Sequence, residues 1–503
     1  MIDTKALREK VLDLAIRGKL VPQDPNDEPA SVLLKKIREQ KKQMVKDGKL
    51  KAKDIKNDTI IFKGDDNLHY EQFADATVKC IEDEIPFELP AGWVWARLSM
   101  VGTTNIGLTY KPTDISDRGT IVLRSCNIKN GKIDLDDLVR VNTPIKENQY
   151  IENNDILICA RNGSRALVGK CALLEDIQEK TSFGAFMAVF RTECYRYLYY
   201  YFNTSFFRSF FDSDDSKQIN QVTQATLRDS LIPLPPFSEQ VRITEKLETT
   251  IEVLDLINER VEATSEIISH IKSKILDLAI QGKLVPQNPD DEPASVLLDR
   301  IRAEKEELIK AGKIKRDKKE SVIFKGEDNS YYEKVENNIK NIADKIPFEI
   351  PESWTFVRLE DVLDYEQPTP YIVKSTDYKY DYQTPVLTAG KSLIIGYTNE
   401  TYGIKTELPV IIFDDFTTDS KYVDFPFKVK SSAMKILTAK EKLITTKFAY
   451  YAMQVVECDN YNHKRYWISE FSKKLIPLPP KNEQVKIVNA IEELYKYIEQ
   501  TLS

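Results

Sequence analysis

The chain lacks the patterns that mark a membrane or a secreted protein. No apolar run of about 18 residues, the length that a membrane helix needs, occurs in its 503 residues, and charges are spread through its start. Its six cysteines include no CxxC pair and do not form a disulfide framework for a chain of this length. These absences predict a soluble, reduced, cytoplasmic protein without a membrane partner.

The chain also lacks an excess of positive charge. It carries 72 Lys and Arg against 79 Asp and Glu, a net charge of −7. This balance excludes a uniformly basic nucleic-acid binder but allows a surface that is basic only locally. Residues 428–474 are such a stretch, with ten basic and four acidic side chains, and we expect them to contact phosphates.

Signatures of catalysis are scarce. The three histidines lie far apart without an HExxH motif, and neither GxSxG nor GxGxxG occurs. Residues 414–421 contain three aspartates and a lysine that resemble a metal-dependent nuclease cluster, but their spacing is compact and 99–230 has no counterpart. We therefore predict a chain without catalytic residues, metal or cofactor of its own. A stand-alone nuclease stays an alternative, and it predicts metal-dependent cleavage.

A long internal repeat dominates the sequence. Residues 10–51 return at 274–315 with 28 identities in 42 positions, and both copies contain the motifs GKLVPQ and DEPAS. Shorter blocks repeat as well, in the pairs 60–72 with 322–334, 83–98 with 344–359, and 231–243 with 475–487.

Between the repeated blocks lie two stretches, about 99–230 and 360–474, that do not resemble each other. Drift after a duplication would spread differences evenly along the chain. Here, nearly identical blocks alternate with stretches that share no similarity. A duplicated scaffold with two different inserts predicts two recognition modules that read two different targets.

Residues 238–282 predict one long helix. It follows a run of prolines and ends at Gly282, a natural residue just beyond a last helical turn. Its apolar residues alternate in steps of three and four, as in a coiled-coil seam, and Asn258 and Ser265 occupy polar seam positions that can set the register. The predicted apolar seam is Leu247, Ile251, Leu254, Val261, Ile268, Ile271, Ile275 and Leu278.

The two chain ends look like halves of this helix. Short amphipathic helices are marginal by themselves, so we expect the ends to meet and form a second long helix antiparallel to the first. Simple amphipathic surface helices are the alternative. The matching seam residues are Ile491, Tyr495, Ile498 and Leu502 at the C-terminal end, and Leu7, Val11 and Leu14 at the N-terminal end.

The predicted fold class is α/β (α+β), with two globular mixed α/β recognition domains separated by an antiparallel pair of long coiled-coil helices. We expect pseudo-twofold symmetry and a circular organisation. The charged segments 35–56 and 299–320 predict exposed, solvated helices, or alternatively a docking surface. The expected segments are a half-helix with a charged helix (1–84), a first domain (85–237), the central helix with a second charged helix (238–345), a second domain (346–480) and the other half-helix (481–503).

Both inserts contain clusters in which cations stand beside planar amides or hydroxyls. Arginine can bind guanine through two hydrogen bonds, and Asn or Gln can bind adenine in the same way. Each cluster could equally be an ordinary polar loop. The candidates are Arg161, Asn162, Arg165, Lys170, Lys217, Gln218, Asn220 and Gln221 in the first insert, and Lys391, Asn399, Thr417, Thr418, Lys421, Asn462, His463, Lys464 and Arg465 in the second.

With these features in view, the whole chain resembles the specificity subunit of a type I restriction–modification enzyme. The resemblance rests on GKLVPQ with DEPAS, on the IPFELPxGW-type entries to each insert and on the LPLPPFSEQ-type exits. Within the second insert it extends to VLTAGKSLIIGYTNETYG and NHKRYWISEFSKKLIPLPP, and within the first to NDILICARNGSRALVGK.

The resemblance implies a non-catalytic subunit whose two target-recognition domains each bind half of a split site in double-stranded DNA, with the helices as a ruler between them. The implied partners are two methyltransferase subunits, which use S-adenosylmethionine, and restriction subunits, which use ATP and Mg²⁺. A coiled-coil adaptor that joins proteins and never reads DNA is the competing class, and it predicts no sequence preference.

Overall fold

The computed structural model describes residues 2–48, 50–56, 58–212, 221–315, 321–336, 338–388, 390, 392–458 and 465–501. Their contacts divide the chain into two compact units, an N-terminal unit (Ile2–Val261) and a C-terminal unit (Glu262–Ser503). The boundary falls within one helix, which therefore contributes residues to both units. No helix in the described ranges is long and apolar enough to cross a membrane.

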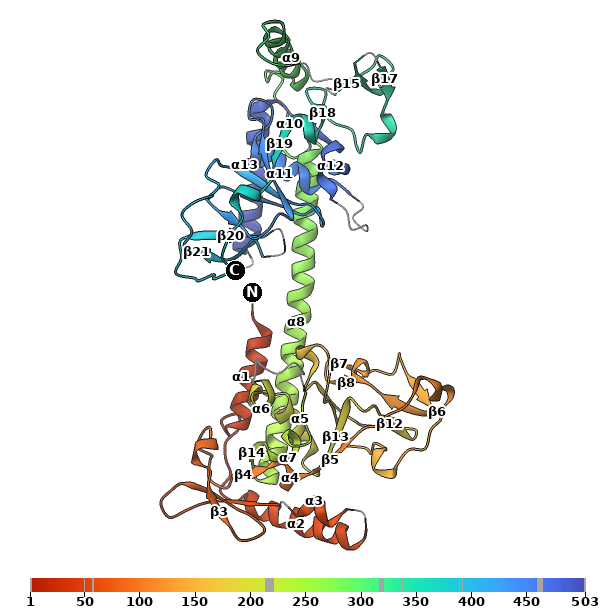
Figure 1. Cartoon of the computed structure of the whole chain (residues 1–503), viewed down its shortest axis with the longest axis vertical. Coiled ribbons are helices and arrows are strands. Elements are labelled where there is room, and N and C mark those ends of the chain that lie inside the picture. Colours follow the sequence, from red (N-terminus) through yellow and green to blue (C-terminus); the bar gives the residue numbers. More distant parts are fainter. Residues whose placement is uncertain are drawn as a thin grey trace. The chain divides into compact units, whose positions relative to one another are not determined.

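That helix, α8 (Phe237–Ile280), is continuous along its length (Figure 1). At its C-terminal end Gly282 has a φ of +72°. The N–H groups of Gly282 and Lys283 donate to the carbonyl oxygens of Ala279 (3.1 Å) and Leu278 (2.8 Å). These two bonds satisfy carbonyls that the helix leaves unpaired, and the left-handed conformation favours glycine. The predicted end of the helix at Gly282 is confirmed.

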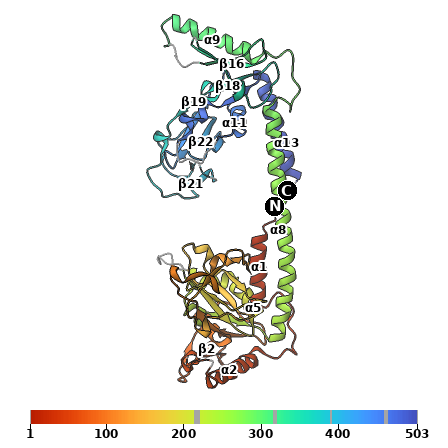
Figure 2. The same ribbon diagram turned by 90° about the vertical axis from the view of Figure 1, so that its right-hand side faces the viewer.

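Helix α1 (Thr4–Ile16) packs antiparallel to the first half of α8 within the N-terminal unit (Figure 2). Thr4 Oγ1 donates to Asn258 Oδ1 at 2.8 Å, and Leu12 shares a core with Leu247. The polar seam residue Asn258 thus has a partner that fixes the register. Leu7 is 44% exposed, so its predicted place in the seam is wrong. The reason is that an α-helix has 3.6 residues per turn, so a strict 3.5 pattern drifts off the contact face.

Helix α13 (Lys481–Thr501) packs antiparallel to the second half of α8 within the C-terminal unit. Tyr495 donates its hydroxyl proton to the carbonyl oxygen of Lys272 at 3.1 Å, and the Lys272 ammonium pairs with Glu499 at 2.8 Å. Because Lys272 fills this part of the contact face, Ile271 is 42% exposed and its predicted place in the seam is also wrong. Leu502 lies outside the described residues.

The charged segments form helices, each followed by a three-stranded antiparallel sheet. We expected an exposed, solvated helix, but one face of α2 is covered, because Leu33, Ile37 and Lys41 are buried. Lys41 donates to the carbonyl oxygen of Ser99 and pairs with Asp58 at 3.8 Å. The elements are α2 (Ala30–Lys46), α3 (Ala52–Ile55), β1 (Ile60–Lys63), β2 (His69–Gln72) and β3 (Val78–Cys80), and in the C-terminal unit α9 (Ala294–Lys310), β15 (Ser321–Lys325), β16 (Tyr331–Val335) and β17 (Asn338–Asn341).

The remainder of the N-terminal unit contains two larger sheets. A four-stranded antiparallel sheet has the order β11–β10–β13–β5, and a three-stranded sheet has the order β12–β6–β9 with β12 parallel to β6. The bounds are β4 (Val94–Arg97), α4 (Leu98–Val101), β5 (Thr103–Ile106), β6 (Ile115–Leu123), β7 (Ile128–Lys129), β8 (Lys132–Ile133), β9 (Val139–Val141), β10 (Ile156–Cys159), β11 (Cys171–Leu173), β12 (Thr181–Phe183), β13 (Met187–Arg191), α5 (Tyr195–Phe202), α6 (Ser205–Asp212), α7 (Thr226–Asp229) and β14 (Leu231–Leu234).

The C-terminal unit repeats this topology with a different sequence. Its antiparallel sheet has the order β19–β25–β22–β23, and its three-stranded sheet β21–β20–β24 again has one parallel pair, β20 with β24. The bounds are β18 (Thr355–Arg358), α10 (Leu359–Val362), β19 (Leu363–Glu366), β20 (Thr384–Leu387), β21 (Ile394–Thr398), β22 (Val410–Asp414), β23 (Ser420–Val423), β24 (Lys428–Val429), β25 (Met434–Ala439), α11 (Thr446–Gln454), α12 (Tyr466–Ser469) and β26 (Leu475–Leu478).

The repeated sequence blocks meet at the base of these sheets. In the N-terminal unit β4 pairs with β14, and the buried carboxylate of Glu239 accepts hydrogen bonds from Trp93 Nε1 (2.9 Å) and Gln23 Nε2 (3.2 Å). The GKLVPQ, entry and exit motifs are therefore three parts of one contact, which joins the first domain to α8. In the C-terminal unit β18 pairs with β26, and Glu483 accepts in the same way from Trp354 (2.9 Å) and Gln287 (2.6 Å).

Candidate nucleic-acid interface

In the N-terminal unit a hydrogen-bonded frame collects three predicted residues at the end of β10. The N–H of Ala160, the first residue after β10, donates to the carbonyl oxygen of Phe186 at 2.9 Å. Its carbonyl oxygen accepts from the N–H of Val222 at 2.7 Å, and the neighbouring residues Arg161 and Gln221 form an isolated β-bridge. Arg161, Asn162 and Gln221 are thereby brought to one surface, although about sixty residues separate them in sequence.

The C-terminal unit has the same frame at the end of β22. The N–H of Asp415, the first residue after β22, donates to the carbonyl oxygen of Ala433 at 3.2 Å. Its carbonyl oxygen accepts from the N–H of Tyr466 at 2.9 Å, so Arg465, the preceding residue, is held beside the 415–419 turn. Arg465 therefore occupies the place of Gln221, and Thr417 that of Asn162. We call these the N-terminal and C-terminal reading surfaces.

The N-terminal reading surface has one exposed cation without a carboxylate partner among the described residues, Arg161, whose guanidinium lies 5.6 Å from the centre of the Phe186 ring. Asn162 is engaged within the protein, because its Nδ2 donates to Ser125 Oγ (3.3 Å) and its Oδ1 accepts from the N–H of Ser164 (2.9 Å). Arg161 and Gln221 are thus freer than Asn162 to meet a ligand.

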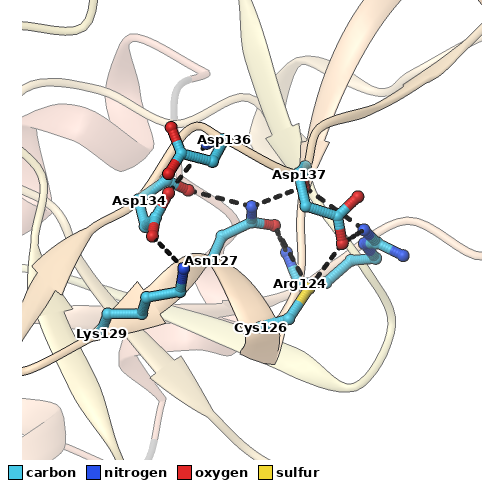
Figure 3. A network of polar contacts seen from close by, with 7 residues as sticks. All are labelled: Arg124, Cys126, Asn127, Lys129, Asp134, Asp136 and Asp137. Atoms are coloured by element: carbon cyan, nitrogen blue, oxygen red, sulfur yellow. Dashed lines mark hydrogen bonds and ion pairs between the residues drawn. The ribbon is translucent and has the colours of Figure 1, made fainter.

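The loop that carries Ser125 is held by its own polar network, shown in Figure 3. The buried amide of Asn127 donates to the carbonyl oxygens of Asp134 (3.0 Å) and Asp137 (2.9 Å). Arg124 pairs with Asp137 at 2.9 Å, and Lys129 pairs with Asp134. Arg124 and Lys129 are thus neutralised locally, which makes them poorer candidates than Arg161 for an anionic ligand.

Other predicted residues of this unit lie apart or are already paired. Arg165 binds the side chain and the carbonyl oxygen of Asp212, and Lys170 is half-buried. The predicted residues Lys217, Gln218 and Asn220 lie outside the described residues.

In the C-terminal unit the 414–419 turn is fixed by Asp414, whose Oδ1 accepts from the N–H groups of Phe416 (2.9 Å) and Thr417 (3.2 Å). Thr418, at a φ of +66°, uses its hydroxyl on the carbonyl oxygen of Thr417. Lys421 lies further along on β23, and Asn399 follows β21 in the other sheet. The predicted residues Lys391, Asn462, His463 and Lys464 lie outside the described residues.

Two lysines of the basic stretch 428–474 are not available for the expected phosphate contacts. Lys435 is buried and pairs at 3.0 Å with Asp415, which is buried too. Lys428 is also buried, and it pairs with Glu400 at 3.1 Å. A charge count cannot distinguish such internal pairs from surface cations, which is why the prediction fails for these two lysines.

The nuclease-like aspartates of the same segment have structural partners. Asp414 caps the turn, and Asp415 binds Lys435 and accepts from the N–H of Trp467 through Oδ1 (2.9 Å). In the described ranges no group of His, Cys, Asp and Glu is placed to hold a metal ion. Burial raises the pKa of the Cys171 thiol to about 12 and that of Cys194 to about 11, so both stay protonated and unreactive at neutral pH.

The structure adds two side chains that the sequence did not single out, Phe186 and Phe416. Both lie on the reading surfaces, and both are exposed. Neither belongs to a motif, and exposure cannot be read from a single phenylalanine in a sequence. The one local signal is the Gly184–Ala185 step before Phe186, which is typical of a turn.

The two α/β domains have the same sheet topology. The loops at the ends of β10 and β22 share a pattern of backbone hydrogen bonds but carry different side chains. The chain is therefore a duplicated scaffold that presents different loops. A family model, the type I restriction modification DNA specificity domain, matches residues 90–264 and 351–503, together more than half of the chain. The chain belongs to this family.

Two curated relatives are similar to this chain in sequence. The EcoR124I/EcoR124II specificity subunit of Escherichia coli is 47% identical over 147 residues, 28% of this chain and 36% of the relative. The EcoAI specificity subunit of E. coli is 29% identical over 414 residues, 72% of this chain and 62% of the relative. The chain thus spans less than two thirds of the length of either one.

A solved chain, from work on complex assembly and conformational transition of the type I R-M system, has a TM-score of 0.47 and 15% identity. The match covers 83% of this chain and 93% of that one.

Proposed function

We propose that this chain is the non-catalytic, sequence-specific DNA-recognition subunit of a type I restriction–modification complex. Each target-recognition domain, 85–237 and 346–480, reads one half of a gapped, asymmetric site in double-stranded DNA. The domains face the major groove, where every base pair has a distinct pattern of donors and acceptors.

The observation that carries this proposal is the frame common to the two reading surfaces. Equal backbone hydrogen bonds, between Val222 and Ala160 in one unit and between Tyr466 and Asp415 in the other, hold Arg161 beside Gln221 and the turn with Phe416 and Thr417 beside Arg465. A scaffold that keeps its backbone and changes its side chains suits two domains that dock alike and read different sequences. Family membership supports the same assignment.

Within this proposal, cations bind phosphates or guanine edges, and amides or hydroxyls bind other base edges. We give the central roles to Arg161 and Gln221 and to Arg465 and Thr417. The remaining proposed DNA contacts are Asn162, Arg165, Lys170, Lys217, Gln218 and Asn220 in the first domain, and Lys391, Asn399, Thr418, Lys421, Asn462, His463 and Lys464 in the second.

The long helix sets the number of unread base pairs between the half-sites. The 44 residues of α8 correspond to a length of about 66 Å at about 1.5 Å per residue. Its packing against α1 and α13 stiffens it, and a stiff helix suits a spacer better than a flexible linker does.

The chain acts by presenting bound DNA to its partners. Two methyltransferase subunits use S-adenosylmethionine to methylate an adenine flipped out of the stack, and restriction subunits use ATP and Mg²⁺. The specificity subunit itself holds none of these cofactors.

The test is a map of N6-methyladenine. The chain is expressed with the methyltransferase encoded beside it in a host free of DNA methylation, and the methyltransferase alone serves as the control. We expect one gapped, asymmetric motif that depends on this chain. A methyltransferase that binds the chain but yields no motif would favour the adaptor alternative, and metal-dependent cleavage by the purified chain would favour the nuclease.

A further inference from the structure

Each reading surface presents a phenylalanine to solvent at the centre of its hydrogen-bonded frame. Phe186 is 62% exposed and Phe416 is 40% exposed. Phe186 provides the carbonyl that anchors the loop after β10, and Phe416 is the second residue after β22. Neither ring belongs to a hydrophobic core of its unit. Packing in the core therefore does not explain why a large apolar side chain stands at either position.

The backbone gives Phe186 little freedom to turn inward. Its carbonyl oxygen accepts two hydrogen bonds, from the N–H groups of Ala160 (2.9 Å) and Arg161 (3.0 Å). The next residue, Met187, donates its N–H to Gly184 at 2.8 Å and closes a tight turn. Arg161 lies against the exposed ring, so the apolar group and a hydrogen-bond donor are presented together.

Phe416 is fixed in a comparable way. Its N–H donates to Asp414 Oδ1, and the preceding residue, Asp415, is buried in an ion pair with Lys435. Arg465 lies beside this turn through the bond between Tyr466 N–H and the carbonyl oxygen of Asp415. The C-terminal reading surface therefore also combines an exposed ring with an arginine that has no carboxylate partner among the described residues.

We propose that Phe186 and Phe416 are specificity-determining residues that contact the 5-methyl group of a thymine, one in each half-site. This inference rests on the proposed function. The 5-methyl of thymine is an apolar group on the major-groove edge of the bases, and phenylalanine is among the side chains that contact it. A ring that is exposed in the free protein becomes buried against that methyl, while the neighbouring arginine binds a base or a phosphate.

The experiment measures binding of the chain, in complex with its methyltransferase subunits, to its mapped site. Each thymine of both half-sites is replaced in turn by deoxyuridine, which keeps the base pairing and removes one methyl group. For the wild type we expect about fourfold weaker binding at one thymine in each half-site, the effect of one methyl group returned to water.

The variants assign each contact. Phe186→Ala should abolish the response to deoxyuridine in one half-site, and Phe416→Ala in the other. Phe62→Ala and Phe324→Ala are matched controls, since these phenylalanines are similarly exposed on β1 and β15, away from the reading surfaces. They should keep both responses, and thermal melting of all four variants checks that they fold.

Four results would overturn the inference. A wild-type complex that binds its site but does not respond to deoxyuridine would overturn it and leave the proposed function intact. If Phe186→Ala and Phe416→Ala both abolished the response to deoxyuridine in the same half-site, the assignment of one ring to each half-site would be wrong. A Phe186→Ala or Phe416→Ala complex that keeps the wild-type response to deoxyuridine in both half-sites would show that the ring does not contact a thymine methyl group. A wild-type complex without any sequence preference would overturn the proposed function as well.

Discussion

The arginines of the two reading surfaces, Arg161 and Arg465, have no carboxylate within reach among the described residues. Arg124 and Arg165 are neutralised by neighbouring aspartates, and Lys428 and Lys435 are buried in ion pairs. Within the proposed function, Arg161 and Arg465 are therefore better candidates to bind DNA than the paired cations. At the scale of single residues, the partners of each cation are a better guide to a binding site than the net charge of a segment.

Replacing Arg465 by alanine should weaken reading of one half-site. Loss of a two-bond contact to a base costs about 1–3 kcal/mol of discrimination, so methylation at sites with a changed base in that half should rise. The other half-site should keep its preference, as the methylome of the variant will reveal. Arg302→Ala is a suitable control, because Arg302 forms a local pair with Asp299 on α9. Equal relaxation of both half-sites would contradict the role of Arg465.

Asp361 predicts a pH dependence of the C-terminal unit. Burial raises the pKa of its carboxyl from 3.8 to about 6 in the folded state. The folded state then binds more protons than the unfolded state between these values, so stability falls as pH rises from about 4 to about 6. Asp361→Asn should flatten that part of the curve of melting temperature against pH. Asp364→Asn, which changes an exposed carboxylate on β19, should leave the curve as it is.

At the scale of elements, the contact between tryptophan, glutamate and glutamine explains why the repeated motifs occur together. Trp93 ends the entry motif, Glu239 lies in the first turn of α8, and Gln23 ends GKLVPQ. Removing a partner leaves a buried carboxylate short of a hydrogen bond, which is costly. The corresponding three motifs meet in the C-terminal unit around Glu483, so one contact depends on three separated motifs in each copy.

Trp93→Phe should lower the free energy of unfolding of the N-terminal unit more than Trp95→Phe does. Both indoles are buried on or beside β4, but only Trp93 Nε1 has a hydrogen-bond acceptor among the described residues. The expected difference is about 1–3 kcal/mol, to be measured by chemical unfolding of the two variants. Equal losses would show that packing of the ring, rather than the bond to Glu239, joins the domain to α8.

At the scale of the whole molecule, the two units share a scaffold and differ in what they present. The entry and exit strands pair at the base of each domain, β4 with β14 and β18 with β26. A domain that begins and ends at one paired base can be exchanged as one segment, provided that its contacts with the helices, such as Trp93 with Glu239, are kept. Under the proposed function, such an architecture would separate reading from spacing, which suits a site made of two independent halves and a fixed gap.

Exchange of residues 85–237 for the corresponding domain of another family member should change one half of the methylated motif. The second half and the number of bases between the halves should stay the same, because 346–480 and α8 are untouched. Mapping N6-methyladenine for the chimaera measures all three features at once. A changed gap would mean that the domain, and not the helix, sets the spacing.

The sequence by itself determined the features that depend on local pattern. Near-identity of 10–51 with 274–315 revealed the duplicated scaffold, and prolines with Gly282 marked the limits of α8. Most of the seam followed from apolar spacing, with Leu7 and Ile271 misplaced because the helical period drifts from the heptad. The conserved-looking motifs identified the family, which the comparison of family models bears out.

Only the tertiary structure decided how the divergent inserts are built and which polar residues meet. The two sheets of each domain pair strands far apart in the chain through backbone hydrogen bonds, and such bonds are independent of side-chain identity, so equal topology was invisible in unlike sequences. The frame that joins Arg161 to Gln221 could not be predicted for the same reason, because its hydrogen bonds also join backbone groups. Burial likewise decided that Lys435 belongs to the interior and Phe186 to the surface, because the neighbours that bury a side chain come from other parts of the chain.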